Sequence, residues 1–221
     1  YGYVRDFQVD GISYLISELD SSIVYVSADT CLLDVTKSSE PKVVINSSYH
    51  GVVTIPEKVT YNGVDYDVRG IDMGAFQGCC NLDSVIIHDS LDEIRNYAFS
   101  GCTNLNGIYL PQGMKWIGGY AFSGCTKLKS AELPKNLIII DDGVFHGCTN
   151  LQYVTIPKGI TLLTGDIFDG CSQLKKIIIY SSTPIRIHYN GGVGTGGHFK
   201  GVSRTECTIF VPENSVADYK T

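Results

Sequence analysis

The sequence AFSGCTNL, residues 98–105, decides the fold because four similar segments occur at intervals of 23 residues. These segments read AFQGCCNL from residue 75, AFSGCTKL from 121, VFHGCTNL from 144 and IFDGCSQL from 167. No insertion or deletion interrupts the five copies, so a chance match is excluded. A fixed period of roughly 20–50 residues is the sequence signature of a repeat protein, in which each period forms one structural unit.

Apolar residues occupy the same positions in every period and therefore form columns. One column contains the phenylalanines Phe76, Phe99, Phe122, Phe145 and Phe168. Another contains the cysteines Cys79, Cys102, Cys125, Cys148 and Cys171. A leucine follows each cysteine by three residues and is itself followed by alternating apolar residues. One such coil cannot bury its own apolar edge but stacked coils can, so both columns are predicted to be structural core.

The spacing L-x-x-V-x-I in each period predicts a short strand that pairs in parallel with its neighbours, at about 4.8 Å. Pro111, Pro134 and Pro157 follow this strand directly, and proline cannot continue a hydrogen-bonded ladder. The A-F-x-G-C segment predicts a single helical or 3₁₀ turn on the far side of the coil. We therefore expect a solenoid of short parallel strands, mostly β or α/β in class.

Irregular segments at both ends predict caps, because an uncapped solenoid would expose its core and strand edges. Asp10-Gly11 and Asn62-Gly63 are typical hairpin turn pairs. Residues 214–219 are compatible with a short closing helix. We expect one structural domain with three parts: an N-terminal β cap at 1–50, a solenoid at 51–212 with five regular repeats over about 71–185 and degenerate end repeats, and a C-terminal cap at 213–221.

The composition argues against several classes of protein. The net charge of −6 disfavours a nucleic-acid groove or a polybasic membrane patch. No apolar run approaches the roughly 20 residues that a membrane span requires. The first residues, YGYVRDFQVD, lack the features of a signal peptide, so we expect that an exported protein has lost its signal or that this sequence omits it.

The pattern A-F-x-G-C-x-x-L-x-x-V-x-I-P, over about residues 50–212, resembles the BspA-like leucine-rich repeats. Residues 7–14 and 211–219 are similar to the usual entry and exit of such domains. The resemblance implies a leucine-rich-repeat solenoid from a secreted or cell-surface protein of gut or oral anaerobic bacteria, associated with adhesion to host matrix proteins or to other cells. The motif residues are core residues, so the resemblance transfers no catalytic residue and no ligand site.

The cysteine column allows three interpretations: disulfides, a metal ladder or buried thiols. The five side chains point the same way, and neither a C-x-x-C motif nor a histidine column accompanies them. We interpret them as free thiols that act as small hydrophobic groups. Cys31, Cys80 and Cys207 lie outside the column, and one disulfide among them stays open. We expect no metal and no cofactor.

Two further motifs have simple structural interpretations. Residues 192–197 contain G-x-G-x-x-G, but repeat sequence follows instead of a helix, which favours a surface loop over a nucleotide site. His188 and His198 flank this loop, and we interpret them as a solvated pair rather than metal ligands.

Catalytic motifs are also absent from the sequence. The carboxylate pairs Asp141-Asp142 and Asp65/Asp67 are interpreted as solvated or capping groups at turns. No G-x-S-x-G or H-E-x-x-H motif is present, so we expect that the protein is not an enzyme. A catalytic set assembled across several repeats remains an alternative.

Residues between the inward positions of the predicted strands should face solvent. One such column is Ile86, Tyr109, Glu132, Thr155 and Ile178, and the other is Ser84, Gly107, Ser130, Tyr153 and Lys176. Exposed aliphatic and tyrosine side chains are typical of interfaces, although strand propensity alone also favours them. Trp116 is expected near the rim where the strand turns. The predicted binding residues are Ile86, Tyr109, Glu132, Tyr153, Thr155, Lys176 and Ile178.

Three functions are compatible with these observations. The first is an extracellular or cell-surface adhesion module that binds a host or bacterial surface protein or glycan through its sheet face, with no nucleic-acid partner. The second is a structural spacer or display module of a larger surface protein, which makes contacts mainly through its ends. The third is an enzyme, which requires a cleft with convergent acids of shifted pKa.

Overall fold

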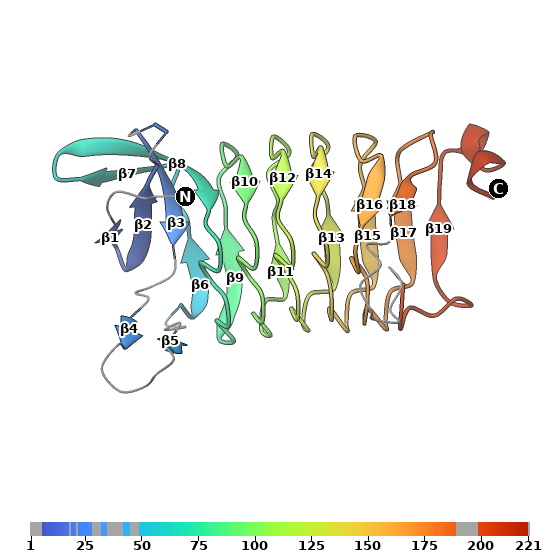
Figure 1. Cartoon of the computed structure of the whole chain (residues 1–221), viewed down its shortest axis with the longest axis horizontal. Coiled ribbons are helices and arrows are strands. Elements are labelled where there is room, and N and C mark those ends of the chain that lie inside the picture. Colours follow the sequence, from blue (N-terminus) through green and yellow to red (C-terminus); the bar gives the residue numbers. More distant parts are fainter. Residues whose placement is uncertain are drawn as a thin grey trace.

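The computed structural model describes residues 6–17, 19–20, 22–27, 32–34, 42–44, 49–188 and 199–220. Successive coils of chain lie side by side along the long axis of the molecule, between an N-terminal β cap and two short C-terminal helical turns (Figure 1). The leucine-rich-repeat solenoid predicted from the 23-residue period is therefore confirmed.

The predicted strand of each repeat lies in one row of parallel strands, here called the front row. Its strands are β6 (Gly51–Thr54), β9 (Leu82–Ile86), β11 (Gly107–Ile108), β13 (Ser130–Glu132), β15 (Tyr153–Ile156), β17 (Lys176–Ile179) and β19 (Thr208–Phe210). The row consists of a three-stranded sheet, β6 to β11, and a four-stranded sheet, β13 to β19. In the regular repeats, residues 23 apart are partners, as for Tyr153 and Lys176, so the register there repeats with the sequence, whereas the partners in the end strands β6 and β19 are 31 or 32 residues apart.

A second row of strands, here called the back row, was not predicted. It consists of β8 (Val64–Ile71), β10 (Glu93–Ile94), β12 (Trp116–Ile117) and β14 (Ile139–Ile140), followed by the separate pair β16 (Leu162–Thr164) and β18 (Arg186–His188). The regular coils contribute only two or three residues each to this row. So short a segment shows no alternation in sequence, which is why one strand per repeat was expected.

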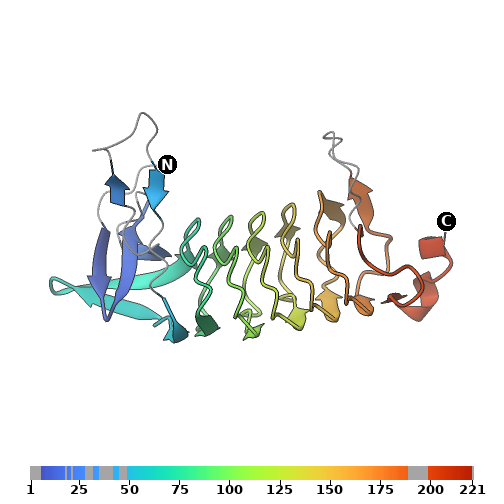
Figure 2. The same ribbon diagram turned by 90° about the horizontal axis from the view of Figure 1, so that it is seen from below.

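The N-terminal cap is a β structure continuous with the back row. Its strands are β1 (Asp6–Val9), β2 (Ile12–Ile16), β3 (Ile23–Ser27) and β7 (Lys58–Tyr61), with a separate pair β4 (Leu32–Asp34) and β5 (Lys42–Val44). Strand β3 pairs in parallel with β8, and the β7–β8 hairpin extends beyond the first coil (Figure 2). The predicted turn residues Asp10 and Gly11 have φ angles of 51° and 77°, and Asn62 and Gly63 have 52° and 77°. Such angles are those of a two-residue hairpin turn.

The phenylalanine column forms the centre of the core. All five rings are fully buried and stack in order along the solenoid, with centroid separations of 5.0–6.1 Å and interplanar angles of 1–11°. Tyr49 contacts the first ring and Phe199 the last, at 4.8 and 5.7 Å. The stack therefore runs from the cap to the last repeat without a gap.

The cysteine column is buried beside these rings, and four of its five thiols donate hydrogen bonds to the preceding coil. From Cys102 onward, each Sγ donates to the carbonyl oxygen of the phenylalanine 26 residues earlier, as for Cys102 to Phe76 at 3.0 Å. Burial raises the pKa of the Cys171 thiol to about 12. Cys80 and Cys207 are also free, whereas Cys31 lies outside the described residues.

The A-F-x-G-C segment is a hydrogen-bonded turn that also connects coils. The amide of Cys79 donates to the carbonyl of Phe76 at 3.1 Å, while the amide of Phe76 donates to Ala98 in the next coil at 2.7 Å. The glycines of this motif have positive φ, for example 72° at Gly78, which explains their recurrence. The turn thus adds a third line of inter-coil hydrogen bonds to the two rows of strands.

The C-terminal end closes with two 3₁₀ turns instead of the single short helix expected. They are η1 (Glu213–Ser215) and η2 (Asp218–Lys220). The Tyr219 hydroxyl lies 3.2 and 2.9 Å from the carbonyl oxygens of Ser181 and Thr183, which joins this end to the last coil. The predicted glycine-rich loop at 192–197 and His198 lie outside the described residues, as does the side chain of His188.

Candidate binding site on the front row

The predicted binding residues lie on the front row but differ in exposure. Ile86 and Tyr109 are 54% and 52% exposed. Glu132 and Lys176 are exposed, whereas Tyr153 and Ile178 are half-buried. The aliphatic and tyrosine members of the predicted set are therefore more exposed on β9 and β11 than on β15 and β17.

Thr155 is a correction to the predicted set. Its side chain is only 6% exposed, and its hydroxyl oxygen accepts a hydrogen bond of 3.1 Å from the amide of Leu133. A threonine can satisfy a backbone amide in this way where an aliphatic residue cannot. The expectation that Thr155 presents a free surface is wrong.

A groove crosses β13, β15 and β17 on the same face. Its volume is about 530 Å³, within the roughly 300–1,000 Å³ of typical ligand pockets. Its lining residues are Gln112, Glu132, Leu133, Lys135, Tyr153, Thr155, Pro157, Lys158 and Tyr180. The structure thus brings together Glu132, Tyr153 and Thr155 from the predicted set, whereas Ile86, Tyr109, Lys176 and Ile178 do not line this groove.

Four groove residues were missed by the sequence analysis. Tyr180 takes the place of proline directly after β17, and Gln112, Lys135 and Lys158 follow the proline in three successive repeats. The regular spacing of 23 residues between Gln112, Lys135 and Lys158 was the available signal, and Tyr180 occupies the preceding proline position of the next repeat. Strand alternation does not indicate these residues because they follow the strands.

The groove combines aromatic faces with charges of both signs. Tyr180 is 58% exposed, and Lys135 donates its backbone amide to the side-chain oxygen of Gln112 at 3.0 Å. Beside the groove, the Lys176 ammonium lies 5.8 Å from the ring centre of Tyr153 and 5.0 Å from that of Phe210. Aromatic rings attract cations at such distances.

Tyr153 is a neutral hydrogen-bonding group in this groove. Desolvation raises the pKa of its phenol, and the negative charge of Glu132 and the neighbouring Tyr180 raise it further. Among the described residues, no group of three or more histidine, cysteine, aspartate or glutamate side chains could hold a metal ion. The groove offers stacking, hydrogen bonding and charge, which are the elements of recognition.

Tyr109 and Trp116 have local partners outside the groove. The Tyr109 hydroxyl donates to Asp89 Oδ1 at 2.8 Å, and the Trp116 indole N–H donates to Asp141 Oδ2 at 2.8 Å. Trp116 lies in β12 of the back row, so its expected place at the rim of the front strand is wrong.

The other carboxylate pair belongs to the hairpin of the cap. Asp65 accepts a hydrogen bond of 2.6 Å from the Thr60 hydroxyl, and Asp67 forms an ion pair of 3.3 Å with Lys58. Both acids lie within β8 and not at a turn, which corrects that expectation.

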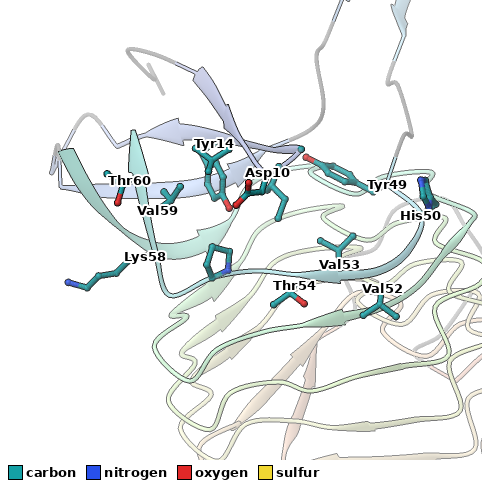
Figure 3. A pocket seen from close by; sticks show the side chains of 14 residues that line it. Asp10, Tyr14, Tyr49, His50, Val52, Val53, Thr54, Lys58, Val59 and Thr60 are labelled. Carbon is teal, nitrogen blue, oxygen red and sulfur yellow. The ribbon is translucent and has the colours of Figure 1, made fainter. Parts of the chain in front are cut away.

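A second cavity lies at the N-terminal end of the front row, between the β1–β2 hairpin, β6 and β7 (Figure 3). Its volume is about 620 Å³, and its wall includes Asp10, Tyr14 and Tyr49. The Tyr49 hydroxyl accepts a hydrogen bond from the Ser13 amide at 3.1 Å and donates to the Ser27 carbonyl at 3.3 Å. No sequence motif indicated this cavity, because its walls come from separate segments of the cap and the first repeat.

The repeats can be compared with known families. Six copies of the BspA type leucine-rich repeat region match residues 69–189, which is more than half of the chain. The chain belongs to the BspA-type leucine-rich repeat family. A comparison of this family member with curated proteins finds no match. In the described part of the chain, no helix has the length and apolar character needed to cross a bilayer.

Several solved structures resemble this BspA-type protein. A leucine-rich repeat protein from Bacteroides ovatus is 30% identical, with a TM-score of 0.54, over 80% of this chain and 50% of the other. A leucine-rich cell surface protein from Faecalibacterium prausnitzii is 22% identical, with a TM-score of 0.60, over 97% of this chain and 56% of the other. The Treponema pallidum leucine-rich repeat protein is 21% identical, with a TM-score of 0.62, over 98% of this chain and 97% of the other.

These leucine-rich repeat structures support the fold assignment. The present chain spans about half the length of the Bacteroides and Faecalibacterium proteins, at 50% and 56%. The pneumococcal vaccine antigen PcpA is 19% identical, with a TM-score of 0.68, over 96% of this chain and 51% of the other. Similar solenoids therefore occur within longer bacterial proteins.

Proposed function

We propose that this chain is the binding module of a bacterial cell-surface or secreted protein, and that it holds a protein or glycan partner in the groove over β13, β15 and β17. The observation that carries the proposal is the groove itself, where Tyr153 and Tyr180 accompany Glu132, Lys135 and Lys158. Membership of the BspA-type family and the cell-surface relative from Faecalibacterium prausnitzii support the location.

The composition of the groove supports recognition without catalysis. Large aromatic side chains supply contact area at small entropic loss, and charged groups beside them supply specificity. The rigid parallel strands beneath fix the lining residues, because every coil is hydrogen-bonded to its neighbours. A partner bound here needs little rearrangement of the solenoid.

The proposal is tested with printed arrays of glycans and of extracellular matrix proteins. The fluorescently labelled chain is compared with the double variant Tyr153→Ser/Tyr180→Ser, whose changes remove both aromatic walls without entering the core. We expect the wild-type chain to bind a defined subset of spots and the variant to lose at least about tenfold in affinity, a usual result for two aromatic contacts.

The matched control is Ile138→Ser/Leu162→Ser, which removes two exposed apolar side chains from the back-row side, 63% and 39% exposed. This control should bind the same spots as the wild type. Binding that survives the tyrosine variant, or that disappears only in the control, places the site elsewhere. Absence of any bound spot favours the spacer role.

A further inference from the structure

Strand β6 lies at the N-terminal end of the front row. Among the described residues it pairs with β9 alone, so in that part of the chain its other edge has no partner strand. The amides of Gly51 and Ile55 donate to carbonyl groups of the β9 coil at 2.8 and 2.9 Å. Alternate residues of a parallel strand direct their backbone groups to opposite edges, so Val52 and Thr54 direct theirs away from β9. No backbone hydrogen bond joins Val52 or Thr54 to another residue in the described ranges.

The unpaired edge borders the N-terminal cavity. Val52, Val53 and Thr54 form one wall, and the β1–β2 turn and β7 form the others (Figure 3). The cavity measures about 620 Å³ and is open to solvent along β6, where Val52 is 61% exposed. Unpaired backbone groups beside an open space are a template for an added strand.

The charge of the cavity favours a basic occupant. Asp10 and Tyr14 carry their oxygen atoms close together in the wall (Figure 3). Burial, followed by the electrostatic effects of Tyr49 and Asp10, raises the pKa of Tyr14, whose side chain is only 1% exposed, so the negative charge of this wall is that of Asp10. The charge of Lys58 is offset by Asp67 at 3.3 Å. The described residues 49–93 contain eight acidic and two basic side chains, so the electrostatic potential of this part of the chain is also negative.

We infer that the free edge of β6 binds an extended peptide segment of a partner protein, which adds as a further strand and places a lysine or arginine side chain at Asp10. Backbone hydrogen bonds to Val52 and Thr54 provide affinity in this mode, and side-chain contacts provide specificity. The site lies at the end of the front row, away from the groove over β13, β15 and β17, and is independent of the proposed function.

The first test uses the acetylated and amidated pentapeptide Val-Lys-Val-Lys-Val as a probe. In a titration followed by two-dimensional NMR of the ¹⁵N-labelled chain, the amide signals of Val52 and Thr54 should shift and their hydrogen exchange should slow. A peptide N-methylated at alternate amides cannot pair, and its affinity should fall by at least about tenfold. The glutamate peptide Val-Glu-Val-Glu-Val should also bind more weakly, because it repels Asp10.

Variants of the protein test the same edge. Thr54→Pro removes an unpaired N–H without breaking a bond to β9, so it should reduce peptide affinity by at least about tenfold. The matched control, Ile209→Pro, makes the same change on β19, the other terminal strand of the front row, and should leave affinity unchanged. Asp10→Asn should weaken the lysine peptide but not a peptide of alternating valine and threonine.

Three results overturn the inference. One is failure of the lysine peptide to bind at millimolar concentration. Another is binding that tolerates N-methylation of the peptide, because strand pairing then plays no part. A third is binding that follows Ile209→Pro instead of Thr54→Pro. Since the N-methylated peptide leaves the protein unchanged, the test does not depend on the stability of a variant.

Discussion

Two columns of the repeat, separated by one residue in sequence, behave differently. The phenylalanine column has the same residue in every coil, and all five rings are fully buried. The column two residues earlier contains Gly74, Tyr97, Tyr120 and Gly143, with φ angles of 66°, 59°, 56° and 63°. In the fifth coil it contains Asp166, and the positive φ of 57° belongs to the preceding Gly165. The backbone conformation of this column therefore repeats in four coils although its residue type does not. The comparison shows that the residue type repeats where a side chain enters the core, whereas at the outer surface only the backbone conformation repeats.

The outer column carries strain that the inner one avoids. A non-glycine residue in the left-handed region loses roughly 1–2 kcal/mol. Tyr97 and Tyr120 accept this conformation and stack on each other, with centroids 5.4 Å apart and planes at 7°. Such a ring pair contributes about 0.5–1.5 kcal/mol. Because both tyrosines are strained and they form one ring pair, surface stacking offsets only part of the backbone strain.

The largest expected effect comes from the inner column. Phe122→Ala should lower the free energy of unfolding by about 3–5 kcal/mol, because it interrupts the ring stack and leaves a cavity. Chemical denaturation monitored by circular dichroism measures this change. A decrease of less than about 1 kcal/mol in the free energy of unfolding would show that the phenylalanine column contributes no more to stability than the outer column.

Gly143→Ala should have the next largest effect, a loss of about 2 kcal/mol. An added Cβ would require a left-handed alanine and would also collide with the Tyr120 ring. The matched control is Gly107→Ala, where no atom lies within 4 Å of the new Cβ. In thermal unfolding, the midpoint temperature should be lowered for Gly143→Ala but not for Gly107→Ala. Equal midpoints for the two variants would contradict the requirement for glycine at position 143.

A smaller effect separates strain from stacking at Tyr97. Tyr97→Ala loses the ring contact and retains the unfavourable φ, whereas Tyr97→Gly loses the contact and removes the strain. The glycine variant should be more stable than the alanine variant by about 1 kcal/mol in urea denaturation. If Tyr97→Ala is as stable as Tyr97→Gly or more stable, the positive φ angle at this position causes no backbone strain.

The smallest effect concerns His88, which stands where Pro111, Pro134 and Pro157 stand in later coils. Both ring nitrogens are buried, and neither has a hydrogen-bond partner among the described residues. Burial lowers the pKa of His88, and Arg69 lowers it further, while Glu57 and Asp89 oppose this shift.

The folded-state pKa of His88 is therefore below the unfolded value of about 6.5. Its contribution to stability is complete above that pH and is lost as the pH falls toward the folded pKa, since the unfolded chain binds the proton more readily. Unfolding midpoints measured from pH 7.5 to pH 5 should fall less steeply for His88→Asn than for the wild type. Identical slopes would show that another group is responsible.

The core and the repeat register were predictable because identical residues that recur every 23 positions are compatible with few arrangements of the coils. The Asp10-Gly11 and Asn62-Gly63 turns were predictable for a local reason, since their residue types match positive φ angles. The back row was not, because Glu93, Trp116 and Ile139 share a strand position without sharing chemistry.

The groove was only partly predictable. Glu132 and Tyr153 were identified from strand alternation, but Tyr180 and Lys158 follow the strands, where alternation no longer applies. The Thr155 hydroxyl lies at the groove but is covered, because it accepts a hydrogen bond from the Leu133 amide of the preceding coil. A pattern of apolar and polar letters cannot show such a pairing between coils.

The uniform stacking of coils sets the distance between the β6 edge and the groove. In the front row β13 is the third strand after β6, and adjacent strands lie about 4.8 Å apart. Because each coil contacts mainly its neighbours, duplication or loss of one 23-residue coil between the two sites would leave both of them intact. If the number of repeats changed during evolution, the distance between the β6 edge and the groove would change only in whole multiples of one strand spacing.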